Sequence, residues 1–167
     1  MVNFKTDKYW LNIGIGSFNT FKYSGGLHES IDINLVQKNT LYKVQYQYND
    51  ELKILSSKLP IENLHSFNIL MGKQFVSNDD LYIRLAGGLG VFTGNLRGER
   101  ILKKTTGWFS QTTYDDEKIT TLSIPLEAEL ALVPIKYAQL ALNVFGNVNL
   151  KRPLYGLAIK VGVGKIK

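Results

Sequence analysis

The sequence has 167 residues, about the length of one domain, and a formal net charge of +6 at neutral pH. With 44% hydrophobic and 20% charged residues it is not a disordered chain, and no apolar run approaches the roughly 18 to 20 residues of a membrane-spanning helix. Cysteine is absent, which excludes disulfides, thiol nucleophiles and thiolate metal sites.

Apolar and polar residues alternate with a period of two along most of the chain, and Gly, Asn, Asp, Ser or Pro bound each segment. This pattern predicts an all-β chain that forms a single domain over residues 1–167. In chain order, the expected strands are residues 8–17, 27–36, 41–48, 65–74, 81–92, 119–132, 137–148 and 155–166.

The links between these strands alternate in length. Residues 37–40, 77–80 and 133–136 are tight turns, whereas residues 18–26, 49–64, 93–118 and 149–154 are longer links. An up-and-down barrel places every second link at the same rim, so this alternation favours such a barrel with both termini at the short-turn rim. The longest stretch, residues 97–118, is the one candidate for an inserted subdomain, but we interpret it as a plain mobile loop.

Parity separates each expected strand into two faces. One face is apolar and uncharged in its central stretches, as at Leu11, Ile13 and Leu142, and the other is small or polar, as at Asn12 and Gly14. Glycine weakens a strand exposed to water, but it suits the crowded lumen of an eight-stranded barrel. We therefore expect the polar face inside and the apolar face outside, against lipid.

The charges of the polar face nearly balance. The acidic residues of this face are Asp32, Glu127 and Glu129, and the basic residues are Lys43, Arg84 and Lys160. Because unpaired charge in a narrow lumen is costly, the sequence predicts an ion-pair network there. We also expect aromatic girdles at the two membrane interfaces, formed by Tyr9, Tyr42, Tyr48, Phe67, Tyr82, Phe92, Tyr137 and Tyr155.

Four segments, YWLNIGIGSF, LYIRLAGGLGVF, QLALNVFGNVNL and YGLAIKVGVG, resemble strands of the small outer-membrane barrels of the OmpA/OmpX type, particularly the glycine-punctuated ones of Bacteroidetes. The resemblance implies an eight-stranded antiparallel transmembrane barrel with short periplasmic turns and longer extracellular loops. It also implies a bacterial outer-membrane location. Residues 1–10 contain no apolar stretch followed by a small-residue cleavage site, so we expect a signal peptide to have been removed or to lie outside this sequence.

Candidate catalytic residues are few. His28 and Ser30 share a face at the long-link end of the second strand, but Glu29 points away from them. Glu127 and Glu129 are same-face neighbours that suit ion pairs better than a sugar. Neither histidine has a second ligand at metal-binding spacing. We expect no catalytic residues, no metal, no cofactor and no nucleic-acid partner.

Basic and aromatic residues gather in the third long link. Arg97, Arg100, Lys103 and Lys104 lie near Trp108 and Phe109 in the sequence, a combination that suits lipopolysaccharide phosphate, a surface glycan or a partner protein. A plain solvated loop explains them equally well.

The leading hypothesis is a non-enzymatic outer-membrane barrel, structural or accessory, that contacts outer-membrane lipid and lipopolysaccharide and presents its long loops to a partner such as another outer-membrane protein. Two alternatives stay open at this point. A soluble calycin-like or lipocalin-like barrel would hold a small apolar ligand inside its apolar face. A lipid-modifying outer-membrane enzyme would use His28 and Ser30.

Overall fold

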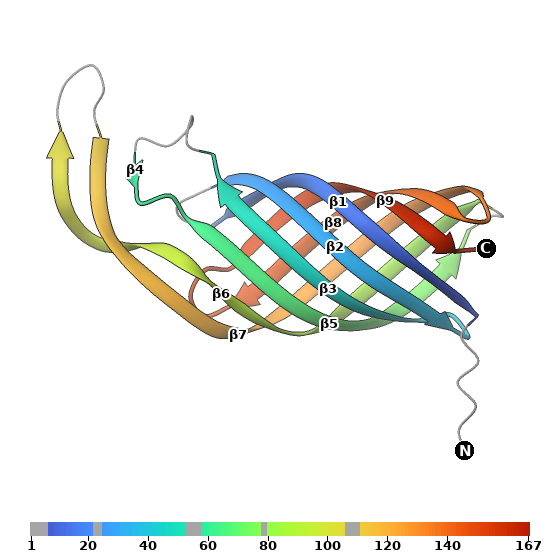
Figure 1. Cartoon of the computed structure of the whole chain (residues 1–167). Helices are drawn as coiled ribbons and strands as arrows, with labels where there is room; N and C mark the ends of the chain where they lie inside the picture. The colour runs from blue at the N-terminus through green and yellow to red at the C-terminus, as the bar shows by residue number, and fades with distance from the viewer. Residues whose placement is uncertain (1–6, 22–24, 53–57, 78–79, 106–110) are drawn as a thin grey trace.

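The computed structural model describes residues 7–21, 25–52, 58–77, 80–105 and 111–167. Within these ranges it contains nine strands (Figure 1). They are β1 (Lys8–Thr20), β2 (Gly25–Gln37), β3 (Thr40–Glu51), β4 (Lys58–Leu59), β5 (Asn63–Val76), β6 (Leu81–Thr105), β7 (Gln111–Ile135), β8 (Ala138–Asn149) and β9 (Leu154–Lys165).

Eight of these strands form a closed antiparallel barrel. Each pairs with the next one along the chain, and β1 pairs with β9 from Tyr9↔Lys165 to Thr20↔Leu154, which closes the ring. The two-residue strand β4 lies outside this ring and pairs in parallel with β7. The expected eight-stranded up-and-down barrel is confirmed.

The short turns gather at one end of the barrel, together with the start of β1 and the end of β9 (Figure 1). Between β2 and β3, Lys38 and Asn39 both have positive φ, of 47° and 65°. This is the conformation of a two-residue hairpin turn whose twist matches that of its strands. We call this end the short-turn rim and the opposite end, where the long links lie, the mouth.

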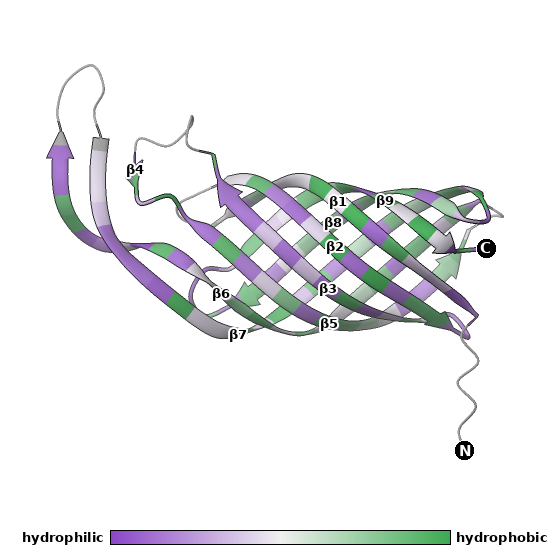
Figure 2. Ribbon diagram, viewed as in Figure 1, coloured by the Kyte–Doolittle hydropathy of each residue, from purple (hydrophilic) through white to green (hydrophobic). Residues whose placement is uncertain are grey.

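Apolar and polar residues alternate along the barrel strands (Figure 2), and the apolar side chains are the ones that lie outside. Ile69 and Leu122 are 71% and 79% exposed, whereas Asn12 and Lys160 are fully buried inside. A protein in water buries its Leu, Ile and Val, so this inverted arrangement suits a barrel wall that faces hydrocarbon. We call the outer apolar surface the apolar belt. The calycin-like alternative is therefore wrong, since it requires the apolar face to surround an internal cavity.

Inside the barrel, a polar middle layer lies between two apolar clusters. The cluster at the short-turn rim contains Trp10, Val36, Leu41, Tyr82, Ala131, Val133, Ala141 and Ile166. The cluster at the mouth contains Phe18, Leu64, Phe92, Leu96, Ile119, Phe145, Leu154 and Ala158. The assignment of Tyr82 and Phe92 to outer girdles is thus wrong, because both share the inward parity of Arg84 and are almost completely buried.

The third long link differs most from expectation. Instead of a mobile loop over residues 97–118, β6 and β7 continue as a two-stranded ribbon that leaves the barrel at the mouth and curves away (Figure 1). The pairing continues to Thr105↔Gln111 with irregularities between Arg97 and Lys103. Both faces of this ribbon are largely polar, so it lacks the apolar alternation that marked the barrel strands.

Candidate functional site

The middle of the lumen contains six charged side chains, all buried: Asp32, Lys43, Arg84, Glu127, Glu129 and Lys160. Lys160 Nζ lies 2.9 Å from Asp32 Oδ2 and 3.5 Å from Glu127 Oε1. Lys43 Nζ lies 2.5 Å from Glu127 Oε2 and 3.7 Å from Glu129 Oε2. Three carboxylates thus face three cations, and the charges of the layer sum to zero.

Arg84 lies at the end of this ion-pair network that is nearer the short-turn rim. Its Nη1 donates to Glu129 Oε1 at 2.5 Å and to Gln139 Oε1 at 2.8 Å, while its Nε donates to Gln74 Oε1 at 2.8 Å. The guanidinium also lies 4.3 Å from the ring centre of Trp10, within cation–π range. The groups that satisfy the charges therefore also fill the cross-section of the lumen.

His28 and Ser30 lie inside the barrel, away from the lipid-facing wall. His28 is fully buried, its Nδ1 lies 2.8 Å from Asn49 Oδ1, and its ring stacks on Phe145 with centroids 3.9 Å apart. Ser30 is also buried, and no hydrogen bond among the described residues joins its hydroxyl to His28. This geometry gives no support to acyl transfer, because a lipid in the apolar belt cannot reach either side chain.

The mouth is closed by a second set of ion pairs that the sequence did not reveal, which we call the mouth clasp. Arg97 Nη2 lies 2.5 Å from Glu51 Oε2, and Arg152 Nη2 lies 2.5 Å from Glu62 Oε1. Arg97 Nε also donates to the carbonyl of Pro60 at 3.3 Å. These bonds hold residues 58–62 between the end of β3 and the ribbon, across the top of the lumen.

Arg97 thus departs from its expected role as an exposed contact, because its side chain points inward to Glu51. Arg100, Lys103 and Lys104 lie on β6 in the ribbon and are exposed. Trp108 and Phe109 lie outside the described residues. The sequence contains only a weak signal for the mouth clasp. Glu51, Glu62 and Arg152 lie in or beside long links at the same rim and carry opposite charges, but strand parity does not indicate which of them pair.

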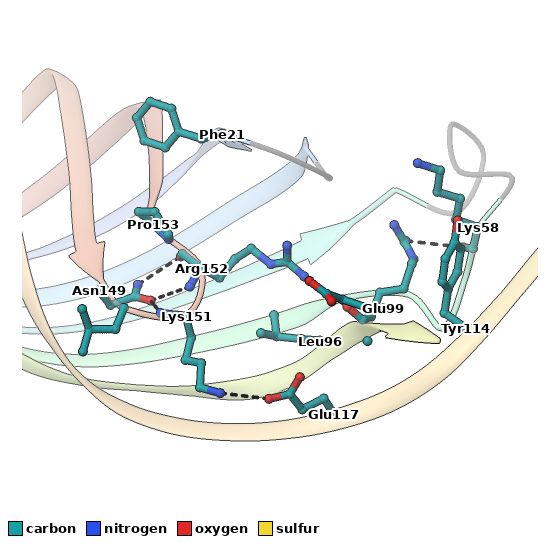
Figure 3. A pocket seen from close by; sticks show the side chains of 13 residues that line it. Phe21, Lys58, Leu96, Glu99, Tyr114, Glu117, Asn149, Lys151, Arg152 and Pro153 are labelled. Carbon is teal, nitrogen blue, oxygen red and sulfur yellow. Dashed lines mark hydrogen bonds and ion pairs between the residues drawn. The ribbon is translucent and has the colours of Figure 1, made fainter. Parts of the chain in front are cut away.

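A pocket of about 800 Å³ opens at the mouth between the ribbon and the β8–β9 turn (Figure 3). Its lining residues are Phe21, Lys58, Leu96, Arg97, Gly98, Glu99, Tyr114, Glu117, Asn149, Leu150, Lys151, Arg152 and Pro153. We call it the mouth pocket. Aromatic, cationic and acidic side chains meet there, and this mixture suits a polar ligand or partner segment more than a purely apolar one.

The β8–β9 turn has a fixed shape at the edge of the mouth pocket. Asn149 Oδ1 accepts hydrogen bonds from the backbone N–H groups of Lys151 and Arg152, at 3.0 and 2.6 Å. Lys151 Nζ then reaches Glu117 Oε1 of the ribbon at 3.1 Å, as Figure 3 shows. The turn and the ribbon therefore form one continuous wall of the pocket.

In the part of the chain that the structure describes, no three His, Asp or Glu side chains are arranged to hold a metal ion. The same ranges contain no helix that could cross a membrane.

No protein-family model matches this sequence, and no curated protein matches it. Solved structures are similar in fold. Neisserial surface protein A superposes with a TM-score of 0.67 at 11% identity, over 93% of this chain and 95% of that one. The N-terminal β-barrel domain of Pseudomonas aeruginosa OprF gives 0.64 at 10% identity, over 95% and 98%.

Ail, the attachment invasion locus protein of Yersinia pestis, gives a TM-score of 0.61 at 8% identity, over 94% of this chain and 96% of that one. These neighbours are small eight-stranded outer-membrane β-barrels, and the likeness shows that this chain has their fold.

Proposed function

We propose that this protein is an integral barrel of the bacterial outer membrane, structural or accessory, that presents its ribbon and mouth pocket to a partner outside the membrane. It catalyses no reaction and conducts nothing through its lumen. The observation that carries the proposal is the combination of an apolar belt with a lumen that is filled from rim to mouth.

Because the lumen is filled, a partner can contact the protein only at the ends of the barrel or on its outer surface. The two apolar clusters and the six paired charges occupy the interior, and the mouth clasp covers its top. Eight strands leave an interior just wide enough for side chains, so a pore or an internal ligand has no room. What extends into the surrounding medium is the ribbon, with Arg100, Lys103 and Lys104 exposed along β6.

The partner is a protein, such as another outer-membrane protein, or a surface glycan that reaches the ribbon and mouth pocket. Exposed cations along β6 would draw an acidic surface toward the ribbon. The mixed lining of the mouth pocket would then determine orientation.

Cysteine labelling on intact cells tests this topology, since the native sequence contains no cysteine. Arg100→Cys, in the ribbon, should react with a membrane-impermeant maleimide on intact cells. Lys136→Cys, between β7 and β8 at the short-turn rim, is the matched control and should react only after lysis. The folded protein should also fractionate with outer membranes and shift in gel mobility on heating.

Two results would contradict the proposal. One is a well-folded monomer in buffer without detergent or lipid, because the apolar belt should aggregate in water. The other is labelling of Lys136→Cys, but not of Arg100→Cys, on intact cells, which would place the mouth on the periplasmic side.

A further inference from the structure

A polar hollow of about 420 Å³ lies on the outer wall of the barrel, across β5, β6 and β7. Its lining residues are Asn63, His65, Thr93, Gly94, Asn95, Lys118, Ile119 and Thr120. It is separate from the mouth pocket, which shares none of these residues. We call it the wall pocket.

The strand register places the wall pocket directly above the apolar belt. Phe67, Val91 and Leu122 are aligned across the three strands and are 59%, 41% and 79% exposed. The next outward-facing row toward the mouth begins with His65, which is aligned with Thr93 and, through it, with Thr120. The wall therefore changes from apolar to polar within one row.

A second polar row follows, in which Asn63 is aligned with Asn95 and Asn95 with Lys118. Two residues along a strand rise by roughly 7 Å. The headgroup region is roughly 5 to 8 Å thick on each side of the hydrocarbon core. If the apolar belt matches the hydrocarbon, the first polar row lies at the level of the lipid headgroups on the mouth side, and the second row lies at the outer edge of that layer.

The wall pocket is rich in hydrogen-bond donors and contains no carboxylate among its lining residues. Lys118 is exposed, and no ion pair within the described ranges involves it. Three carboxylates lie near the pocket without lining it. Asp50 on β3 is aligned with Asn63 and is separated from Lys118 by β5 and β6. On β7 itself, Glu117 pairs with Lys151, and Asp116 is exposed on the ribbon side of Lys118. An anion at Lys118 therefore meets no carboxylate among the lining residues of the pocket, and the exposed Asp116 lies outside that lining.

His65 is held in place at the other side of the pocket. Its Nδ1 lies 2.7 Å from the hydroxyl of Tyr46, and its ring centroid lies 4.9 Å from that of Tyr48. Thr93 and Thr120 also line the pocket, and both hydroxyls donate to the carbonyl of Ile119, at 2.9 and 3.0 Å. The imidazole Nε2, the two asparagine amides and the Lys118 ammonium are the groups left to face a ligand.

We infer that the wall pocket binds the phosphate of a lipid in the mouth-side leaflet, while the acyl chains of that lipid lie along Phe67, Val91 and Leu122. Lys118 provides the charge-assisted hydrogen bond, and His65 and the asparagine amides orient the phosphate oxygens. The lipid is either a phospholipid or the phosphorylated lipid anchor of lipopolysaccharide. This inference rests on the membrane insertion in the proposed function.

Native mass spectrometry of the intact protein, released from detergent micelles, tests the inference. The probes are phosphatidic acid, bisphosphorylated lipid A, and a diacylglycerol with the same acyl chains as the phosphatidic acid but no phosphate. The variants are Lys118→Gln, His65→Gln and the double variant. Lys73→Gln is the matched control, because Lys73 is an exposed, outward-facing lysine near the short-turn rim.

We expect a phosphate-bearing lipid to bind the parent protein and the Lys73→Gln variant alike. The double variant should bind it about tenfold or more weakly, since hydrogen bonds to charged groups are the strong ones. Preference for phosphatidic acid would identify a phospholipid, and preference for lipid A would identify lipopolysaccharide; either supports the site.

Equal binding of diacylglycerol and phosphatidic acid would overturn the inference, because only the acyl chains would then be recognised. An equal loss in Lys73→Gln and Lys118→Gln would also overturn it, because the attraction would then be a general effect of basic charge. The two proposals can fail separately. If Arg100→Cys is labelled on intact cells as expected but the protein binds neither phosphate-bearing lipid, the wall pocket is not a lipid site, and the proposed function still stands.

Discussion

The middle of the lumen and the ribbon use charged residues in opposite ways. In the lumen, each cation of the six-residue layer is buried against a carboxylate, as Lys160 is against Asp32 at 2.9 Å. Along β6 of the ribbon, Arg100, Lys103 and Lys104 are exposed. The difference teaches that the charges in the lumen hold the barrel together, whereas the basic side chains of the ribbon face the surrounding medium.

Removing a lumen cation should have the largest effect. Lys160→Met leaves Asp32 without its cation and takes one of two from Glu127, and breaking a buried pair costs about 3 to 5 kcal/mol. Urea unfolding in lipid vesicles measures this loss, with Lys103→Met in the ribbon as the control, whose stability should stay close to that of the parent. Equal stability of the two variants would remove the contrast between the regions.

Two glycines allow a second comparison between the lumen and the outer wall, with an expected effect of intermediate size. At Gly88, which faces the lumen, a Cβ would overlap the backbone of Ile69, so Gly88→Ala should cost about 1 to 3 kcal/mol. At Gly146, on the outer wall, the nearest atom to an added Cβ is Leu154 O at 3.8 Å, so Gly146→Ala should be tolerated. The same urea unfolding assay compares them, and a more harmful change at Gly146 would argue against this packing.

The smallest effect is expected at the exposed ion pair between the β8–β9 turn and the ribbon. Lys151 and Glu117 are 53% and 49% exposed, so Lys151→Gln should cost about 0 to 1 kcal/mol. Salt should screen this pair, so the difference from the parent should vanish in 1 M salt. A loss that survives high salt would mean that the turn and the ribbon are coupled by more than this contact.

Much of the barrel could be predicted from the sequence because alternation is a local signal. Each expected strand corresponds to an observed one, and parity placed Asn12 inside and Leu11 outside. Parity also placed Tyr82 and Phe92 inside, but the expectation of aromatic girdles overrode it. Both residues have the parity of Arg84, so the alternation of the strand indicates their position better than their aromatic character does.

The ribbon and the mouth clasp could not be predicted in the same way. The ribbon is solvated on both faces beyond the mouth, so the alternation that marks a half-buried strand is missing from residues 97–118. In the mouth clasp, Glu62 and Arg152 are 90 residues apart and meet only because the barrel closes. The turn after β7 lies later than expected because β7 runs on through Pro134 to Ile135.

The pairing of Asp32 with Lys160 also has a consequence for how the chain assembles. These residues are 128 positions apart, on β2 and β9, and β9 must meet β1 before they can pair. An open sheet entering a bilayer would expose Asp32 to hydrocarbon without its cation, which is costly. Insertion and ring closure should therefore occur as one concerted and slow step, as expected for a fold dominated by distant contacts.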